Sequence, residues 1–439
     1  MTIVGSTRKV KNYSSLIVLG LSACGALAVA CGSDDDSGTV SYAGSGNASA
    51  GRSGAGAAGK ASAGAGNDGR AGAGAGDAVA GENAGGDAGT PGAAGAAAAG
   101  EGGAAGGDQG QAGAPPLAQF AVEQTNLVAD QDNVAVTTDP RLLNAWAIAI
   151  NPTAQVFWLS ANHGGSAPVY GADGSIKPID PTVPPASGDD PGSPTGQVFN
   201  SGANFMADKF IVDTEDGQIM GWAAGTVFTQ RAHSDTAIYK GLALVGAGAN
   251  QQLLAANFHD ARIDIFDANY AAVANPDAFK DPSIPNTYAP FNVVSIADKV
   301  YVTYAEQDAD KEDDVAGAGQ GYVSVFDGAG TLLKSWLAGG KLNAPWAVSP
   351  APAGFGVPAT ALLVGNFGDG SINAFDTISG EYLGSLTDKS GSPLVIVGLW
   401  DLKVGPTGTT DLSNTLFFSA GGDFEAHGLF GKLEATGLE

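Results

Sequence analysis

Cysteine is nearly absent from this chain, and the position of its two copies is informative. Cys24 and Cys31 lie close to the N-terminus, and no cysteine follows them in the 439-residue sequence. A disulfide framework or a cysteine nucleophile in a later folded domain is therefore excluded. The sequence also contains no Gly-x-Ser-x-Gly motif. Its four histidines are scattered over different repeat units, where only the fold could assemble a catalytic triad: His163, His233, His259 and His427.

Basic residues are also scarce, with 20 Lys and Arg against 45 Asp and Glu and a formal net charge of -25. The first 31 residues carry +3 and residues 32–115 carry -6, which leaves -22 for the rest of the chain. Such an acidic domain is a poor partner for nucleic acid or for bare anionic lipid. The charge instead favours cation binding or simple solubility.

The N-terminal segment has the pattern of an export signal. Three basic residues precede an apolar stretch that begins at Leu16, and small residues follow. The run ending at Cys24, Leu21-Ser22-Ala23-Cys24, resembles a bacterial lipobox, and Cys31 is a looser second match before a polar segment. We therefore predict a lipoprotein signal peptide over 1–31 and a lipid anchor at the outer membrane or cell surface. An ordinary secretory peptide with incidental cysteines is the alternative.

Large apolar side chains are almost missing from residues 32–115, which consist mainly of Gly, Ala, Ser and Asp. Such a segment cannot bury enough surface to offset the entropy of ordering it. We predict a disordered, low-complexity linker here, followed by one folded domain over 116–439.

Helical periodicity is not sustained anywhere in this domain, but a β-rich unit recurs six times at spacings of about 45–55 residues, the range of one propeller blade. The units begin near residues 144, 194, 240, 290, 345 and 398. Asp/Gly turns separate strands of alternating polarity, and the segments 253–267 and 362–376 are nearly superimposable. These features predict an all-β, six-bladed β-propeller. The strand-like segment 120–128 is placed to complete the last blade beside 428–433.

Several motifs carry a resemblance to known proteins: residues 126–130, 288–292, 301–305, 342–346 and 363–370. Through them, residues 120–434 resemble an uncharacterised bacterial family of exported conserved hypothetical proteins, related in architecture to NHL-type propellers. The resemblance implies an NHL-like propeller and implies no chemistry.

The innermost strand of each predicted blade begins with a residue expected at the mouth of the central channel. Our alignment gives Trp146, Thr195, Lys240, Phe291, Trp346 and either Leu399 or Trp400. Propeller lactonases and phosphotriesterases hold a metal at this place through Asn and acidic side chains, a pattern from which this chain departs. The aromatic residues have two interpretations: they fill the core, or they stack on a sugar or an apolar ligand.

The densest acidic segment, 308–314, is an insertion between two predicted strands. Alternating carboxylates on a loop followed by glycines suit Ca²⁺, which makes Asp308, Asp310, Asp313 and Asp314 candidate ligands. A solvated acidic loop is the other interpretation.

Two functions remain open from the sequence. The first is a cell-envelope binding or scaffolding propeller for an unknown protein or carbohydrate, with a domain that is monomeric. The second is a hydrolase or lactonase-like enzyme acting at the channel mouth. The sequence does not decide whether the protein is an enzyme, because a fold alone does not determine chemistry.

Overall fold

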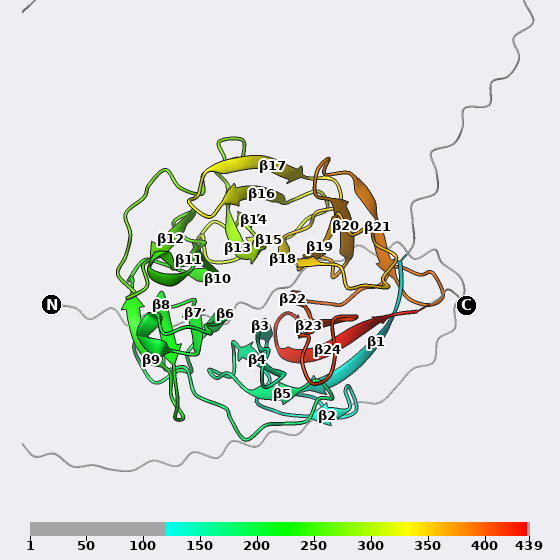
Figure 1. Ribbon diagram of the computed structural model, residues 1–439, viewed down its shortest axis with the longest axis horizontal. Coiled ribbons are helices and arrows are strands. Elements are labelled where there is room, and N and C mark those ends of the chain that lie inside the picture. Colours follow the sequence, from blue (N-terminus) through cyan, green and yellow to red (C-terminus); the bar gives the residue numbers. More distant parts are fainter. Residues whose placement is uncertain (1–119, 437–439) are drawn as a thin grey trace, which may run out of the picture. The chain divides into compact units, whose positions relative to one another are not determined.

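A computed structural model of the chain describes residues 120–436, and these form a six-bladed β-propeller, as predicted (Figure 1). Its only helical elements are the single turns η1 (Phe205–Ala207) and η2 (Gly248–Asn250). No helix within 120–436 is long and apolar enough to cross a membrane. The predicted signal peptide, Cys24, Cys31 and the linker lie outside the described residues.

Each blade is an antiparallel sheet whose first strand faces the centre of the ring (Figure 1). Blade 1 contains β3 (Ala145–Asn151), β4 (Val156–Ala161) and β5 (Val169–Gly171). Blade 2 contains β6 (Pro194–Phe199), β7 (Phe210–Thr214), β8 (Gln218–Trp222) and β9 (Thr229–His233). Blade 3 contains β10 (Tyr239–Val245), β11 (Gln252–Asn257) and β12 (Arg262–Phe266).

The second half of the ring follows the same plan. Blade 4 contains β13 (Tyr288–Ile296), β14 (Lys299–Gln307), β16 (Tyr322–Asp327) and β17 (Leu332–Ala338), with the short β15 (Asp314–Val315) paired to β14. Blade 5 contains β18 (Pro345–Pro350), β19 (Ala361–Asn366), β20 (Ile372–Asp376) and β21 (Tyr382–Thr387). Blade 6 contains β22 (Leu399–Val404), β23 (Thr415–Gly422), β24 (His427–Ala435) and β1 (Phe120–Ala129), beside which β2 (Thr137–Thr138) runs parallel.

The turns explain why the two most similar sequence segments fold alike. In β19–β20 the turn contains Gly370 at φ +71°, a conformation that glycine adopts without steric cost. The equivalent position in β11–β12 is Ala261, which takes the same left-handed conformation at φ +53°. Both turns are followed by strands whose side chains are mostly buried, and β20 is buried on both faces over its first four residues. Each turn joins an antiparallel pair in the equivalent register, so the predicted similarity of the two hairpins is confirmed.

The ring is closed by a strand from the beginning of the domain. β1 runs antiparallel to β24, with Val122 opposite Ala435 and Ala129 opposite Leu429. The first residues of β1 also pair with β21 of blade 5, since Phe120 lies opposite Leu386. The predicted closure by residues 120–128 is therefore confirmed, and blade 6 gains a covered outer edge.

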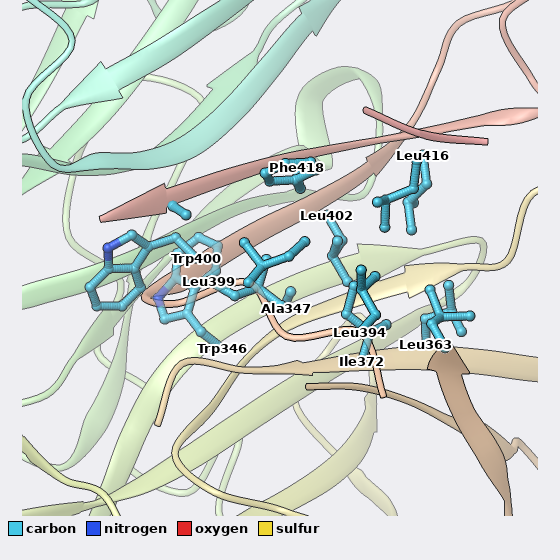
Figure 2. Close-up of a cluster of buried hydrophobic side chains, with 14 of the residues drawn as sticks. Trp346, Ala347, Leu363, Ile372, Leu394, Leu399, Trp400, Leu402, Leu416 and Phe418 are labelled. Atoms are coloured by element: carbon cyan, nitrogen blue, oxygen red, sulfur yellow. The ribbon is translucent and has the colours of Figure 1, made fainter. Parts of the chain in front are cut away.

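Every inner strand contains an irregularity in register near its start, where it reaches the centre of the ring. Such bulges bend a strand and redirect its side chains. The largest buried cluster extends outward from this region, from Trp346 and Trp400 at one end to Leu363 and Leu416 at the other (Figure 2).

Candidate functional site

The six predicted channel-mouth positions meet at the centre of the ring. Trp146 and Trp400 are stacked with ring centroids 3.6 Å apart, and Trp346 approaches Trp400 edge-on at 5.9 Å. Phe291 lies 5.8 Å from Trp400, and Phe367, which the sequence did not single out, stacks on Trp400 at 4.0 Å. These five rings form what we call the aromatic plate. Trp400, and not Leu399, joins them.

The plate fills the centre of the ring as core, because its four inner-strand rings are at most 2% exposed. This arrangement agrees with the core-filling interpretation, while stacking on a ligand stays a prediction. Hydrogen bonds fix the rings: Trp346 Nε1 donates to the carbonyl of Lys240 at 2.9 Å, and Trp400 Nε1 donates to Asn144 Oδ1 at 3.0 Å. Trp146 Nε1 is buried without a partner.

Thr195, the smallest of the six residues, links neighbouring strands instead of joining the plate. Its hydroxyl contacts the carbonyl of Tyr239 and Asp213 Oδ1, each at 2.8 Å. Asp213 is fully buried, and burial raises the pKa of its carboxyl to about 7. A neutral carboxyl is the form that such surroundings favour.

Lys240 is the centre of a charged cluster at one end of the channel. Its Nζ lies 2.6 Å from Glu215 Oε1 and 3.4 Å from Asp313 Oδ1, and 5.3 Å from the centre of the Trp146 ring. The carboxyls of Asp314 and Glu425 also interact electrostatically with Lys240 and Asp313. We call Lys240, Glu215, Asp313, Asp314 and Glu425 the lysine-centred cluster.

Chain direction explains why these residues meet. Glu215 and Glu425 lie in the turns between the second and third strands of blades 2 and 6, and Asp313 lies in the corresponding connection of blade 4. Because neighbouring strands alternate in direction, these turns lie at the same end as the start of the inner strands, where Lys240 is. Three consecutive positive φ angles at 423–425 shape the turn that contains Glu425.

The cluster has more carboxyls than cations, and its electrostatics reflect this. Burial, with repulsion from neighbouring carboxylates, raises the pKa of Asp314 and of Glu425 to about 7 each, although Lys240 opposes the shift. Burial alone would lower the pKa of Lys240, but Glu215 and Asp313 hold it above its ordinary value. Lys240 therefore stays charged, while two of the carboxyls titrate near neutral pH.

Asn144 and Asn162 donate hydrogen bonds to two carboxylates of this cluster. Asn144 Nδ2 donates to Glu425 Oε2 at 2.7 Å, and Asn162 Nδ2 donates to Glu215 Oε2 at 3.0 Å. Asn144 thus connects the cluster with Trp400 of the aromatic plate. The cluster is a continuous polar layer resting on the plate.

The predicted calcium ligands do not all face the same place in the structure. Asp308 Oδ1 accepts the backbone N–H of Glu312 at 2.9 Å, so this carboxylate stabilises its own loop. Asp313 is directed to Lys240, and Asp314 also faces the lysine-centred cluster. Across residues 120–436 no group of three or more His, Cys, Asp or Glu side chains is arranged to hold a metal ion. Calcium binding by Asp308, Asp310, Asp313 and Asp314 stays a prediction from the sequence.

A cavity of about 440 Å³ lies toward the other end of the inner strands, beyond the aromatic plate. We call it the central cavity. Its walls are mainly aliphatic side chains of the inner strands, and Trp346 reaches it from the plate. Ser295 and the partly exposed Lys403 also line it, so the cavity opens to solvent. This volume and apolar lining are typical of small-molecule sites, which measure about 300–1,000 Å³.

Comparison with known proteins shows that the chain has relatives in a virus. It is 32% identical over 326 residues to uncharacterized protein R648 of Acanthamoeba polyphaga mimivirus, a match covering 70% of this chain and 78% of that protein. It is also 32% identical over 326 residues to uncharacterized protein L690 of the same virus, covering 84% of that protein. The chain belongs to the family of these two viral proteins.

The relatives found contradict the family that the sequence motifs predicted. The interpretation of the chain as a member of a bacterial family of exported hypothetical proteins is wrong, because the relatives that define its family are proteins of mimivirus. No protein-family profile matches the chain. The motif at 126–130 lies at the end of β1, and the motif at 363–370 covers β19 and the turn that follows it.

Similarity to solved structures is low. The β-propeller domain of Myceliophteria thermophila Cps50 (Swd1) is 8% identical with a TM-score of 0.39, covering 66% of this chain and 84% of that chain. Kuenenia stuttgartiensis hydrazine synthase is 12% identical with a TM-score of 0.41, covering 70% and 99% respectively. A chain of a nidogen/laminin complex is 11% identical with a TM-score of 0.38, covering 60% and 85%.

Proposed function

We propose that this protein is a binding module that an N-terminal lipid anchors to a membrane and whose propeller takes a small ligand in the central cavity. The propeller fold suggests a binding or scaffolding module. The observation that carries the proposal is the cavity itself, which ends at the aromatic plate, is walled by aliphatic side chains and opens to solvent. A pocket of this kind binds a ligand mainly by burying its apolar surface.

Covering the cavity mouth should remove binding while leaving the fold intact. Ser295 is exposed and lines the mouth, so Ser295→Trp adds bulk without disturbing packed core. We expect the neutral dye N-phenyl-1-naphthylamine to bind the full chain with increased fluorescence, and the Ser295→Trp variant to lose at least tenfold in affinity. Ser187→Trp is the matched control, because Ser187 is also exposed but does not line the cavity. Equal dye binding by all three proteins would argue against a ligand site here.

The anchor rests on the N-terminal sequence alone, where Cys24 and Cys31 each follow a lipobox-like run. Replacing both cysteines by serine should move the protein from the membrane fraction to the soluble fraction of expressing bacterial cells. The two single substitutions identify which cysteine carries the lipid. Retention of the double variant in the membrane fraction would exclude the anchor.

A hydrolase or lactonase-like activity at the opposite end is the second candidate. Asp314 and Glu425, with pKa values of about 7, lie in one cluster with the ammonium group of Lys240. Carboxyls that titrate near neutral pH are suited to general acid–base catalysis. Turnover of esters or lactones by the propeller would favour this candidate over simple binding.

A further inference from the structure

Gln197 is an exception among the residues that follow the six channel-mouth positions on the inner strands. Two positions beyond the predicted channel-mouth residue, five of the six inner strands carry an aliphatic side chain, and only blade 2 has a polar one. The six residues are Ile148, Gln197, Leu242, Val293, Val348 and Leu402. Nothing in the packing of the inner strands demands an amide here, since the other blades are built without one.

The amide group of Gln197 is buried and only half satisfied. The residue is 4% exposed and lines the central cavity. Ser160 donates its hydroxyl to Gln197 Oε1 at 3.5 Å, whereas Gln197 Nε2 has no hydrogen-bond partner. A buried donor without an acceptor is costly, and proteins rarely leave one in place unless something else supplies the acceptor.

Two other buried polar side chains at the cavity already have hydrogen-bond partners. Asn292 donates to the carbonyl of Trp346 at 3.0 Å and accepts the N–H of Val293 at 2.8 Å. Asp401 accepts the N–H of Ile148 at 2.9 Å and that of Leu402 at 2.8 Å. Among the buried side chains of the cavity wall, the Gln197 amide is thus the donor that has capacity for a ligand.

The charges around the cavity restrict the class of ligand further. The one cation at the wall, Lys403, lies 3.1 Å from Asp401 Oδ1 and is compensated there. The chain as a whole carries a net charge of -25, so its field disfavours an anion. A cation has no lone pair to accept the hydrogen of Gln197 Nε2, so it would leave that buried donor without a partner.

We propose that the central cavity binds a neutral, largely apolar molecule that presents a carbonyl oxygen to Gln197 Nε2. This proposal rests on the proposed function and assigns the ligand class of the same site. The aliphatic wall and Trp346 bury the body of the ligand, and the amide selects a molecule with an acceptor at the buried end.

Acetophenone and ethylbenzene test this selection, because they have nearly the same shape and differ in a carbonyl at the position of a methylene. In ligand-observed NMR titrations of the full chain, we expect acetophenone to bind about fivefold to tenfold more tightly, the contribution of one hydrogen bond. Gln197→Leu should make the two affinities equal by weakening acetophenone only. Gln197→Met keeps the shape of the side chain and serves as the test variant if Gln197→Leu melts at a lower temperature than the unchanged protein. It should also make the two affinities equal.

Ser160→Ala is the matched control, because it removes the hydroxyl beside Gln197 Oε1 and leaves the Nε2 donor in place. The preference for acetophenone should survive this change. Equal binding of both compounds to the unchanged protein, or a preference that survives Gln197→Leu and Gln197→Met, would overturn the ligand class while leaving a pocket for apolar molecules. If neither compound nor the naphthylamine dye binds, the proposed function itself fails.

Discussion

Deletion of residues 120–129 from the full chain is expected to abolish the cooperative thermal transition of the propeller. These residues form β1, which pairs with β24 and contributes the buried side chains of Phe120, Val122, Leu127 and Val128. Burial of each such side chain stabilises a fold by about 1.5–3 kcal/mol. Their joint loss is comparable to the whole stability of a typical domain, about 5–15 kcal/mol.

Differential scanning calorimetry of the full and shortened chains measures this effect. Deletion of residues 101–110, from the predicted linker, is a control of equal length that should leave the transition unchanged. A shortened chain that still melts cooperatively within a few degrees of the full chain would show that the ring does not depend on β1. The exposed edge of β24 should also make the shortened chain prone to aggregation.

Replacing Lys240 by methionine is expected to lower the free energy of unfolding by about 3 kcal/mol at pH 8, the lower end of the cost of breaking a buried ion pair, because Glu215 and Asp313 are partly exposed. Lys240 is 3% exposed, and its Nζ approaches both Glu215 and Asp313. Methionine keeps the length and the apolar contacts of the side chain, so the change isolates the charge.

The loss should depend on pH in a predictable direction. Asp314 and Glu425 have folded-state pKa values of about 7, above those of ordinary carboxyls near 4. The folded state therefore binds more protons than the unfolded state between about pH 4 and 7, and these two groups lower stability progressively as pH rises through that window. Without Lys240 their pKa values rise further. We expect the variant to lose clearly less stability at pH 5 than at pH 8.

Urea unfolding of both proteins at pH 5 and pH 8 measures the difference. Lys280→Met is the matched control, because Lys280 is 64% exposed and lies 4.0 Å from the exposed Asp277, a geometry worth little. A loss no larger than that of the control, or one that grows as pH falls, would contradict the role assigned to the cluster.

The architecture was predictable because every blade needs the same kinds of residues at equivalent positions. Each blade needs a turn such as that at Gly370 and a bulky residue such as Trp346 where the strands converge, so six weak signals support one another. The closing strand was predictable for a related reason, since residues 120–128 have a strand pattern without a blade of their own.

The site was predicted only in part. Lys240 was identified from its position in the repeat, but its partners Glu215 and Glu425 lie in turns, whose sequences vary from blade to blade. Asp313 was assigned to a calcium loop because spacing along the chain does not reveal that Lys240, from another blade, lies 3.4 Å from its carboxylate. Gln197 could have been found by aligning the inner strands, where it is the one polar residue at its position.

The pairing of β1 with β24 also determines when this propeller can form during synthesis. β1 is the first strand of the domain to leave the ribosome, and its partner is the last. Because contacts between distant parts of a chain form slowly, the ring stays open until translation of the domain is complete. Blades 1 to 5 therefore remain a partly folded arc until then, and a chaperone that shields the exposed ends of this arc, at blades 1 and 5, should raise the yield of the native ring.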